Sequence, residues 1–275
     1  MKKILFVSKI FLSVVFLIGI FLIGYFFLFS SKDKRYSFAE HSQGLYMSQK
    51  LFDILIFQNP EDSNSYFEKS VAFNKRGEYA EGFRLLDKAV ELNPDWHLGY
   101  RGWLRLVKVK DYRGAIRDLE RLDSLTPNVV DYPWSNNIHY LLGLSYKGLK
   151  EYDYALNEFN KAVTSEKDSS LVNHNLYLHK GIILKDQGKY TDAIANFNAC
   201  LEHSHKQSPE AHYQKALVFK SLEKFDSAQI SLNKSLELFN NGYKHKDIYN
   251  EVSNELYLSD ILLAIDSLNG QTQGD

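Results

Sequence analysis

The sequence predicts an all-α protein, in which an N-terminal transmembrane helix precedes an α-solenoid of about five helix-turn-helix repeats and a C-terminal capping helix. Three observations support this fold class: a long uncharged apolar run near the amino terminus, prolines at a regular spacing, and a pattern of small and large residues that recurs five times. We expect five regions, namely an anchor at 1–31, a helical lead-in or degenerate half-repeat at 32–62, a superhelix at 63–240, a capping helix at 241–268 and a tail at 269–275.

The anchor is predicted from residues 10–29, twenty residues without a charge. At 1.5 Å per residue such a helix spans about 30 Å, the thickness of the hydrocarbon core of a bilayer. A cleaved signal peptide has a shorter apolar region, about 7–15 residues, that ends at a small-x-small site. The residues here are Leu28-Phe29-Ser30-Ser31, with large side chains where a peptidase needs small ones. We therefore expect an uncleaved anchor.

The charges on either side of the apolar run favour one orientation by a narrow margin. Three lysines and the α-amine precede the run, and three basic residues offset by Asp33 follow it. The positive-inside rule then places the amino terminus in the cytoplasm. We expect a single-pass protein of a bacterial inner membrane, with its remaining residues on the extracytoplasmic side.

A repeat of about 34 residues is predicted for the remainder of the chain. Pro60, Pro94 and Pro127 are separated by 34 and then 33 residues. An aromatic residue also recurs, and each time a small residue follows three positions later, a large apolar residue four further on, and a residue that is small in most units three after that. This spacing draws one stripe along a helix, so each unit has a helix with a fixed buried face. The aromatic residues are Tyr79, Tyr112, Tyr152, Tyr190 and Phe225.

These residues resemble the tetratricopeptide repeat, most closely between Ile138 and Val163, where Leu142-Gly143, Tyr146, Tyr152, Ala155, Phe159 and Ala162 match its pattern. The second repeat, near 96–127, departs from this pattern, because Trp103 stands near the position for a small residue and Gly102 precedes it. We expect the first helix of that unit to be shifted by one residue. The units lie near 63–96, 96–127, 136–167, 174–207 and 209–240.

Composition and motifs argue against several classes of function. Thirty-three Lys and Arg against 34 Asp and Glu give a net charge of −1, which provides no general attraction to nucleic acid. The single cysteine, Cys200, excludes a site built from several thiolates, and the Walker, Rossmann, zincin and nucleophile-elbow motifs are absent from the sequence. We expect no enzymatic activity, no cofactor, no metal and no small-molecule substrate. A solvated loop is favoured over a metal site for His203-x-His205.

Two alternatives of other classes stay open. A helical-repeat RNA-binding protein would have a similar period, but after removal of Lys2, Lys3 and Lys9 the chain carries 30 basic and 34 acidic residues. An enzyme with an unrecognised site is the less favoured alternative. The favoured function is a membrane-tethered scaffold or assembly adaptor.

The resemblance places the binding surface on the concave wall, which is formed by the first helix of each unit and suits a protein or peptide partner. An aromatic row beside a lysine row predicts a partner with apolar anchors and acidic groups. The alternative is that the aromatic rings pack between neighbouring helices and the lysines are solvated. The predicted groove residues are Phe67, Tyr100, Tyr140, Leu178 and Tyr213 in one row, and Lys147, Lys185 and Lys220 further along the helices.

Overall fold

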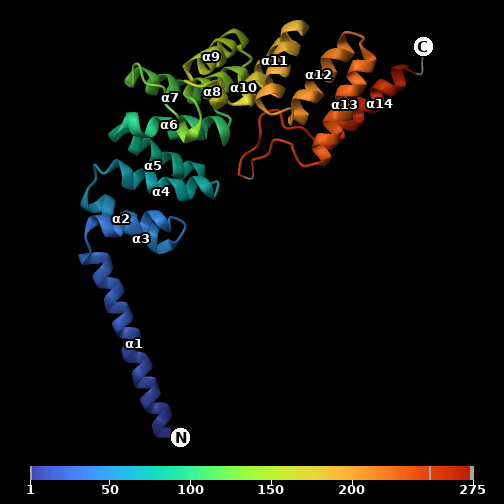
Figure 1. Ribbon diagram of the computed structural model, residues 1–275. Helices are drawn as coiled ribbons and strands as arrows, with labels where there is room; N and C mark the ends of the chain where they lie inside the picture. Colours follow the sequence, from blue (N-terminus) through green and yellow to red (C-terminus); the bar gives the residue numbers. More distant parts are fainter. Residues whose placement is uncertain (1, 248, 273–275) are drawn as a thin grey trace. The chain divides into compact units, whose positions relative to one another are not determined.

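The computed structural model describes residues 2–247 and 249–272, and in this part of the chain every regular element is a helix. The all-α fold class is therefore confirmed. The chain divides into two compact units, Met1–His97 and Leu98–Asp275, which are described separately (Figure 1).

The first unit begins with a long helix that projects away from the helix pair after it (Figure 1). This helix contains a stretch, Lys9–Phe27, that is long and apolar enough to cross a membrane and is not buried inside the protein. The elements of the unit are α1 (Lys2–Phe29), α2 (Lys32–His41), α3 (Tyr46–Gln58), α4 (Ser63–Lys75), α5 (Tyr79–Leu92) and the start of α6 (Pro94–Val107).

The carboxyl end of α1 packs onto the pair α2 and α3. Phe26 and Phe27 contact a small core that includes Leu51 and Phe52. Arg35, which is 5% exposed, donates to the carbonyl of Phe27 at 3.1 Å and to Oε1 of Gln58 at 2.8 Å. The Arg35 guanidinium at the carboxyl end of α1 satisfies a helix carbonyl and complements the helix dipole. The expected lead-in at 32–62 is thus a full pair of helices.

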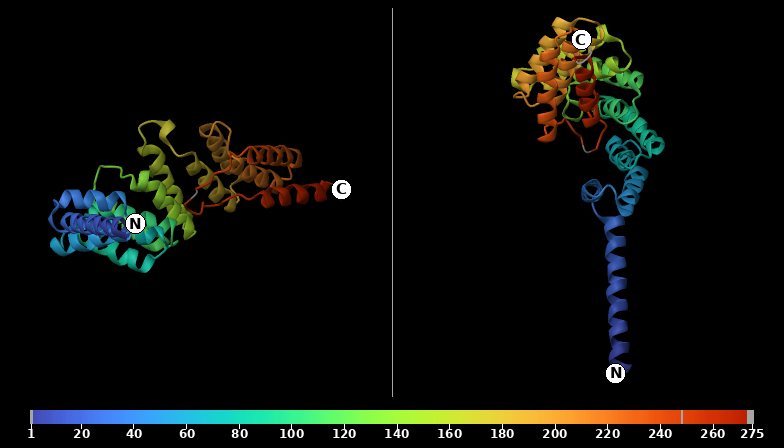
Figure 2. Two further views of the ribbon diagram at one scale, coloured as in Figure 1. Left: turned by 90° about the horizontal axis from the view of Figure 1, so that it is seen from below. Right: turned by 90° about the vertical axis from the view of Figure 1, so that its right-hand side faces the viewer.

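The second unit is a row of helix pairs, seen from two further directions in Figure 2. The two helices pack along their length in the pairs α8 and α9, α10 and α11, and α12 and α13, and α7 contacts α8 and α11 contacts α12. The elements are the rest of α6, α7 (Tyr112–Leu125), α8 (Ile138–Gly148), α9 (Tyr152–Ser165), α10 (His174–Asp186), α11 (Tyr190–His203), α12 (Pro209–Ser221), α13 (Phe225–Asn240) and α14 (Leu258–Thr272).

The predicted stripe is the buried face of the second helix in each pair. In the closest match, Ala155, Phe159 and Ala162 are at most 2% exposed. A Cβ atom on Gly143 would lie 2.5 Å from the ring of Phe159, and one on Gly181 would lie 2.4 Å from the ring of Phe197. Real Cβ atoms do not approach other atoms so closely, so glycine is required for the helices to pack at this distance.

The turn inside each pair ends the first helix in the same way. A residue with positive φ stands two positions before the aromatic residue, and the next backbone N–H returns to a carbonyl near the end of the helix, as in a Schellman motif. Glycine holds this position only twice. The residues are Gly77 (φ 80°), Lys110 (φ 55°), Lys150 (φ 61°), Gly188 (φ 74°) and Glu223 (φ 57°).

The irregular pair α6 and α7 shows the expected shift of one residue. A Cβ atom on Gly102 would lie 2.9 Å from Leu119, so Gly102 fills the small slot and Trp103 lies beside it. The rings of Trp103 and Trp134 stack at 5.3 Å, which orders the connection that contains Trp134. The stack explains why a tryptophan stands in a connection between two pairs.

The C-terminal region differs from the predicted capping helix at 241–268. Helix α13 ends at Asn240, Gly242 has φ 84°, and no helix begins until Leu258. The Asp247 side chain accepts from the backbone N–H groups of Tyr249 and Asn250, a local turn that competes with helix formation. Helix α14 then packs on α12 and α13 and runs to Thr272, past the predicted start of the tail, whose residues 273–275 lie outside the described residues.

Candidate functional site

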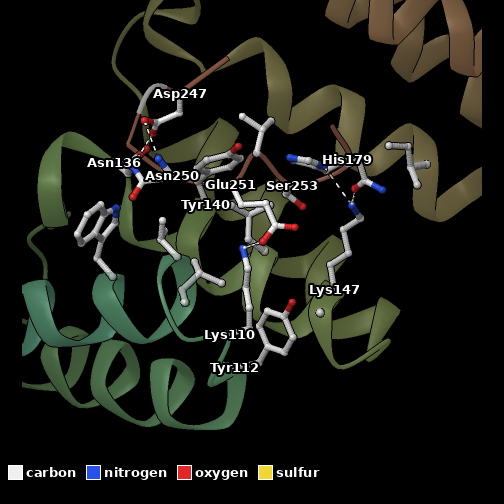
Figure 3. A pocket seen from close by; sticks show the side chains of 18 of the residues that line it. Lys110, Tyr112, Asn136, Tyr140, Lys147, His179, Asp247, Asn250, Glu251 and Ser253 are labelled. Carbon is white, nitrogen blue, oxygen red and sulfur yellow. Dashed lines mark hydrogen bonds and ion pairs between the residues drawn. The ribbon is translucent and has the colours of Figure 1, made fainter. Parts of the chain in front are cut away.

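A groove of about 690 Å³ lies on the inner side of the helix pairs in the second unit (Figure 3). One wall comes from α6, α8 and α10 and from the turns that follow α6 and α8. The other side comes from the chain between α13 and α14, here named the linking segment (residues 243–257, of which 248 is outside the described residues). In Figures 1 and 2 this segment leaves α13, runs back along the helix row and returns to α14.

The predicted aromatic row is mostly packed between helices. Tyr100 and Tyr140 are each 8% exposed, and Leu178 is 2% exposed. The ring of Tyr100 stacks on Trp103 at 5.8 Å, and that of Tyr140 lies against His179 at 6.2 Å. Burial raises the pKa of Tyr140. Tyr140 lines the floor of the groove, and its ring belongs to the core beneath it.

The two ends of the aromatic row lie elsewhere. Phe67 belongs to the first unit, where its ring stacks on His97 at 5.0 Å. Tyr213 is half-buried and packs on the core formed by α12, α13 and α14. The structure therefore does not bring the predicted aromatic residues into one exposed row, and only Tyr140 among them lines the groove.

The three predicted lysines also lie in different places. Lys147 lines the groove, where its Nζ contacts Nδ1 of His179 at 3.2 Å and donates to Oδ1 of Asn254 in the linking segment. Lys185 donates to Gln214 at 2.9 Å, and Lys220 donates to Ser267 of α14 at 2.7 Å. Lys147 is thus the one predicted lysine that meets both sides of the groove.

The pKa of Lys147 is set mainly by the burial of its side chain in the groove. Burial lowers the pKa of its ammonium group to about 8, Asp186 opposes that shift and Lys185 adds to it. His179 is 3% exposed, and burial together with Lys147 holds its pKa well below the usual value. An anionic group from a bound chain would offset the unfavourable burial of the Lys147 charge.

Two further lysines that contact the linking segment were not predicted. Lys108 donates to the carbonyl oxygen of Tyr249 at 2.5 Å, and Lys110 lies 3.5 Å from Oε2 of Glu251. Both follow the end of α6, so they lie outside the helical stretches from which the groove residues were predicted. Lys150 stands at the same point of the next pair and also lines the groove.

In the pair considered as a metal site, His203 has another contact, because its ring stacks on Tyr177 at 5.0 Å. Within the described residues, no group of three or more His, Cys, Asp and Glu side chains has an arrangement that could hold a metal ion.

The family comparison agrees with the spacing of the helix pairs. The family model described as Tetratricopeptide repeat matches residues 137–169, 174–202 and 209–241, which are the pairs α8 and α9, α10 and α11, and α12 and α13. These three helix pairs are tetratricopeptide repeats. A TPR repeat-containing protein of Methanocaldococcus jannaschii is 31% identical over 105 residues, which are 38% of this chain and 31% of that protein.

Several solved structures share the fold of this chain. YrrB, described as a TPR protein with an unusual peptide-binding site, has a TM-score of 0.53 at 21% identity and covers 70% of this chain and 93% of its own. MamA has a TM-score of 0.56 at 17% identity, covering 66% of this chain and 94% of its own. PilW, described as a type IV pilus biogenesis factor, has a TM-score of 0.58 at 10% identity, covering 76% and 94%.

The groove therefore lies along the inner helices of tetratricopeptide repeats. Helices α8 and α10 are the first helices of the first two matched repeats, and both contribute to its wall. The pair α6 and α7 precedes the matched residues and supplies the groove with Trp103 and Lys110.

Proposed function

We propose that this protein is a membrane-tethered scaffold that holds an extended segment of another protein in the groove of its second unit. The observation that supports this proposal is the excess of lysines on the wall of the groove that the repeats form. Its helical wall presents Lys110, Lys147 and Lys150 against one carboxylate, Asp186. A continuous inner surface of helical repeats suits an extended chain, and lysines favour an acidic one. The described peptide-binding site of YrrB, a protein of the same fold, is consistent with this use.

The tether is the helix α1. No part of its apolar stretch is fully buried inside the protein, as expected for a helix that meets lipid. Cleavage after Ser30 would remove Phe26 and Phe27 from the core of α2 and α3 and leave Arg35 without its carbonyl partner. A chain that uses these residues for packing is better explained by a retained anchor than by a removed leader. The charges on either side of the apolar run favour an extracytoplasmic second unit.

A photo-crosslinking experiment in intact cells tests the binding groove. We expect a photo-reactive amino acid at Lys150, which lines the groove, to form adducts with a defined partner after irradiation. The matched control is Lys167, an exposed residue in a connection that does not line the groove. Equal adducts from both positions, or none from Lys150, would contradict the proposal.

A further inference from the structure

We propose that the linking segment is a displaceable ligand of the groove, carried by the chain itself, and that a partner binds by replacing it with a more acidic extended segment. This inference rests on the proposed function and concerns how that same groove is controlled. Figure 3 shows the side chains of Asp247, Asn250, Glu251 and Ser253 over the groove that Tyr140 and Lys147 line from the helices.

The linking segment is held in the groove by polar contacts to three lysines. The Lys108 Nζ donates to the backbone carbonyl of Tyr249, which is a contact that any peptide could make. The Lys110 Nζ pairs with Glu251 at 3.5 Å, and Lys147 donates to the side-chain amide of Asn254. The linking segment thus makes one backbone contact and two side-chain contacts with the lysines, as an extended peptide ligand does with its receptor.

Little apolar burial supports these contacts. Of the described residues from 243 to 255, none is buried, and Tyr249 is 78% exposed. Glu251 has a side chain that is 72% exposed, so water screens its pair with Lys110 and the pair contributes little to stability. The middle of the segment can therefore leave the groove without exposing a core.

The two ends of the segment are fixed more firmly. Lys244 and Glu255 form an ion pair at 2.6 Å that closes the neck of the loop. The backbone N–H of His245 donates to Oε1 of Glu210 at 2.7 Å, and Leu256 is 3% exposed. The loop can open while its neck and α14 stay in place, because these contacts lie outside the groove contacts.

The chemistry of the wall selects what can displace the segment. The segment brings carboxylates to the groove at Asp247 and Glu251, but at Lys147 it offers only the neutral amide of Asn254. A carboxylate at that point would pair two opposite charges, whereas the amide oxygen offers the ammonium group only a dipole. Because a tethered ligand competes at an effective concentration on the order of millimolar, an external segment must be better matched to enter. The favoured occupant is an extended acidic segment of a protein with a carboxylate opposite Lys147.

The test uses the full chain in detergent and a fluorescent peptide of residues 247–255, in its natural form and with Asn254→Asp. A loosened variant carries Glu251→Lys and Asn254→Ala, which reverses the pair with Lys110 and removes the contact with Lys147. We expect the loosened variant to bind the natural peptide at least tenfold more tightly than the intact chain, because its own segment no longer competes. The Asn254→Asp peptide should bind several-fold more tightly than the natural one, and Lys147→Met added to the loosened variant should abolish that difference.

Two controls protect the result from misfolding. Lys167→Glu reverses an exposed charge away from the groove and should bind like the intact chain. In the intact chain, saturation with the Asn254→Asp peptide should speed tryptic cleavage after Lys246 several-fold, and this peptide has no lysine or arginine of its own. Equal affinities of the intact and loosened chains, or no binding by either with unchanged cleavage, would show that the segment is a permanent part of the fold.

The two proposals can fail separately. A partner captured at Lys150 in cells, with no binding of the peptide and no change in cleavage, would leave the scaffold proposal standing and overturn the displaceable ligand. Peptide binding by the loosened chain with no adduct at Lys150 would support the displaceable ligand and contradict an external partner.

Discussion

At the scale of single residues, the helix pairs depend on small side chains where two helices touch. Ala155, Ala193 and Ala228 are each 0% exposed, and they recur three residues after the aromatic that starts the second helix. Opposite them, Gly143 and Gly181 leave room for the rings of the large residues. These positions have no space for one more carbon atom, because protein interiors are closely packed.

Gly143→Ala should lower the free energy of unfolding of the second unit by about 1–3 kcal/mol through overpacking. The added Cβ would lie 2.5 Å from Phe159, which is 0% exposed and has no room to move aside. That penalty exceeds the gain of roughly 0.5–1 kcal/mol that alanine brings to a helix. Denaturant unfolding followed by circular dichroism measures the change in the free energy of unfolding. Gly44→Ala, with no atom within 4 Å of the new Cβ, is the control, and equal stability of the two variants would contradict the packing.

His97 should make the first unit sensitive to acid. The imidazole is 0% exposed, its Nε2 lies 3.1 Å from the hydroxyl of Ser63, and burial lowers its pKa to about 4 against the opposing effect of Asp95. Above about pH 6.5 both the folded and the unfolded states are neutral, so this contribution is complete. As the pH falls from about 6.5 towards 4, only the unfolded state takes up the proton, and stability falls by roughly 1.4 kcal/mol per pH unit.

Hydrogen exchange of the α4 amides at pH 7.5 and at pH 5 measures this loss in the first unit. His97→Gln keeps a polar side chain that does not titrate, and its α4 amides should respond less to pH. An identical response in the variant and the natural chain would show that His97 is not the group responsible.

At the scale of elements, each helix pair is closed by the same left-handed residue. Gly188 fills this position at φ 74°, and the N–H of Lys189 donates to the carbonyl of Leu184 at 2.8 Å. Lys150 and Glu223 hold the same conformation without being glycine. A residue with a Cβ atom is disfavoured there, so these turns are maintained by the packing of the helices on either side.

Gly188→Ala should destabilise the pair α10 and α11 by about 1 kcal/mol, because alanine disfavours positive φ and the new Cβ meets no atom within 4 Å that could compensate. Gly188→Asn should lose less, since asparagine tolerates the left-handed region. Thermal unfolding of the two variants makes the comparison. A larger loss of stability with asparagine than with alanine would contradict the explanation from the positive φ of the backbone.

At the scale of the whole molecule, the chain consists of two compact helical units, and the first of them begins with the apolar helix α1. Within the first unit the apolar helix α1 packs on α2 and α3 and is held by Arg35, and the repeats of the second unit carry the groove. A scaffold of this kind would keep its binding surface attached to a membrane.

The orientation of the whole molecule is predicted from the basic residues around α1. A phosphatase that works only outside the cytoplasm, fused after Asp275, should be active, because the lysines before the span favour a cytoplasmic amino terminus. A fluorescent reporter that matures only in the cytoplasm, fused at the same place, is the control. An inactive phosphatase with a fluorescent reporter would reverse the orientation.

The sequence by itself determined the helix pairs, since their signals are local. The spacing of Tyr152, Ala155 and Phe159 recurs within one helix, and the shift at Gly102 could be read from two adjacent residues. The long apolar helix α1 was likewise visible as a run of apolar residues. Periodicity records which face of a helix is buried, and this property needs no knowledge of distant contacts.

Only the tertiary structure decided which side chains line the groove and what fills it. The contact between Lys108 and Tyr249 joins residues 141 positions apart, and no pattern within either segment points to the other. The same holds for Tyr140, whose ring is placed by neighbouring helices, and for the linking segment, whose local turns prevent the predicted helix. Such contacts depend on how the helix pairs stack, because stacking brings distant parts of the chain to one surface.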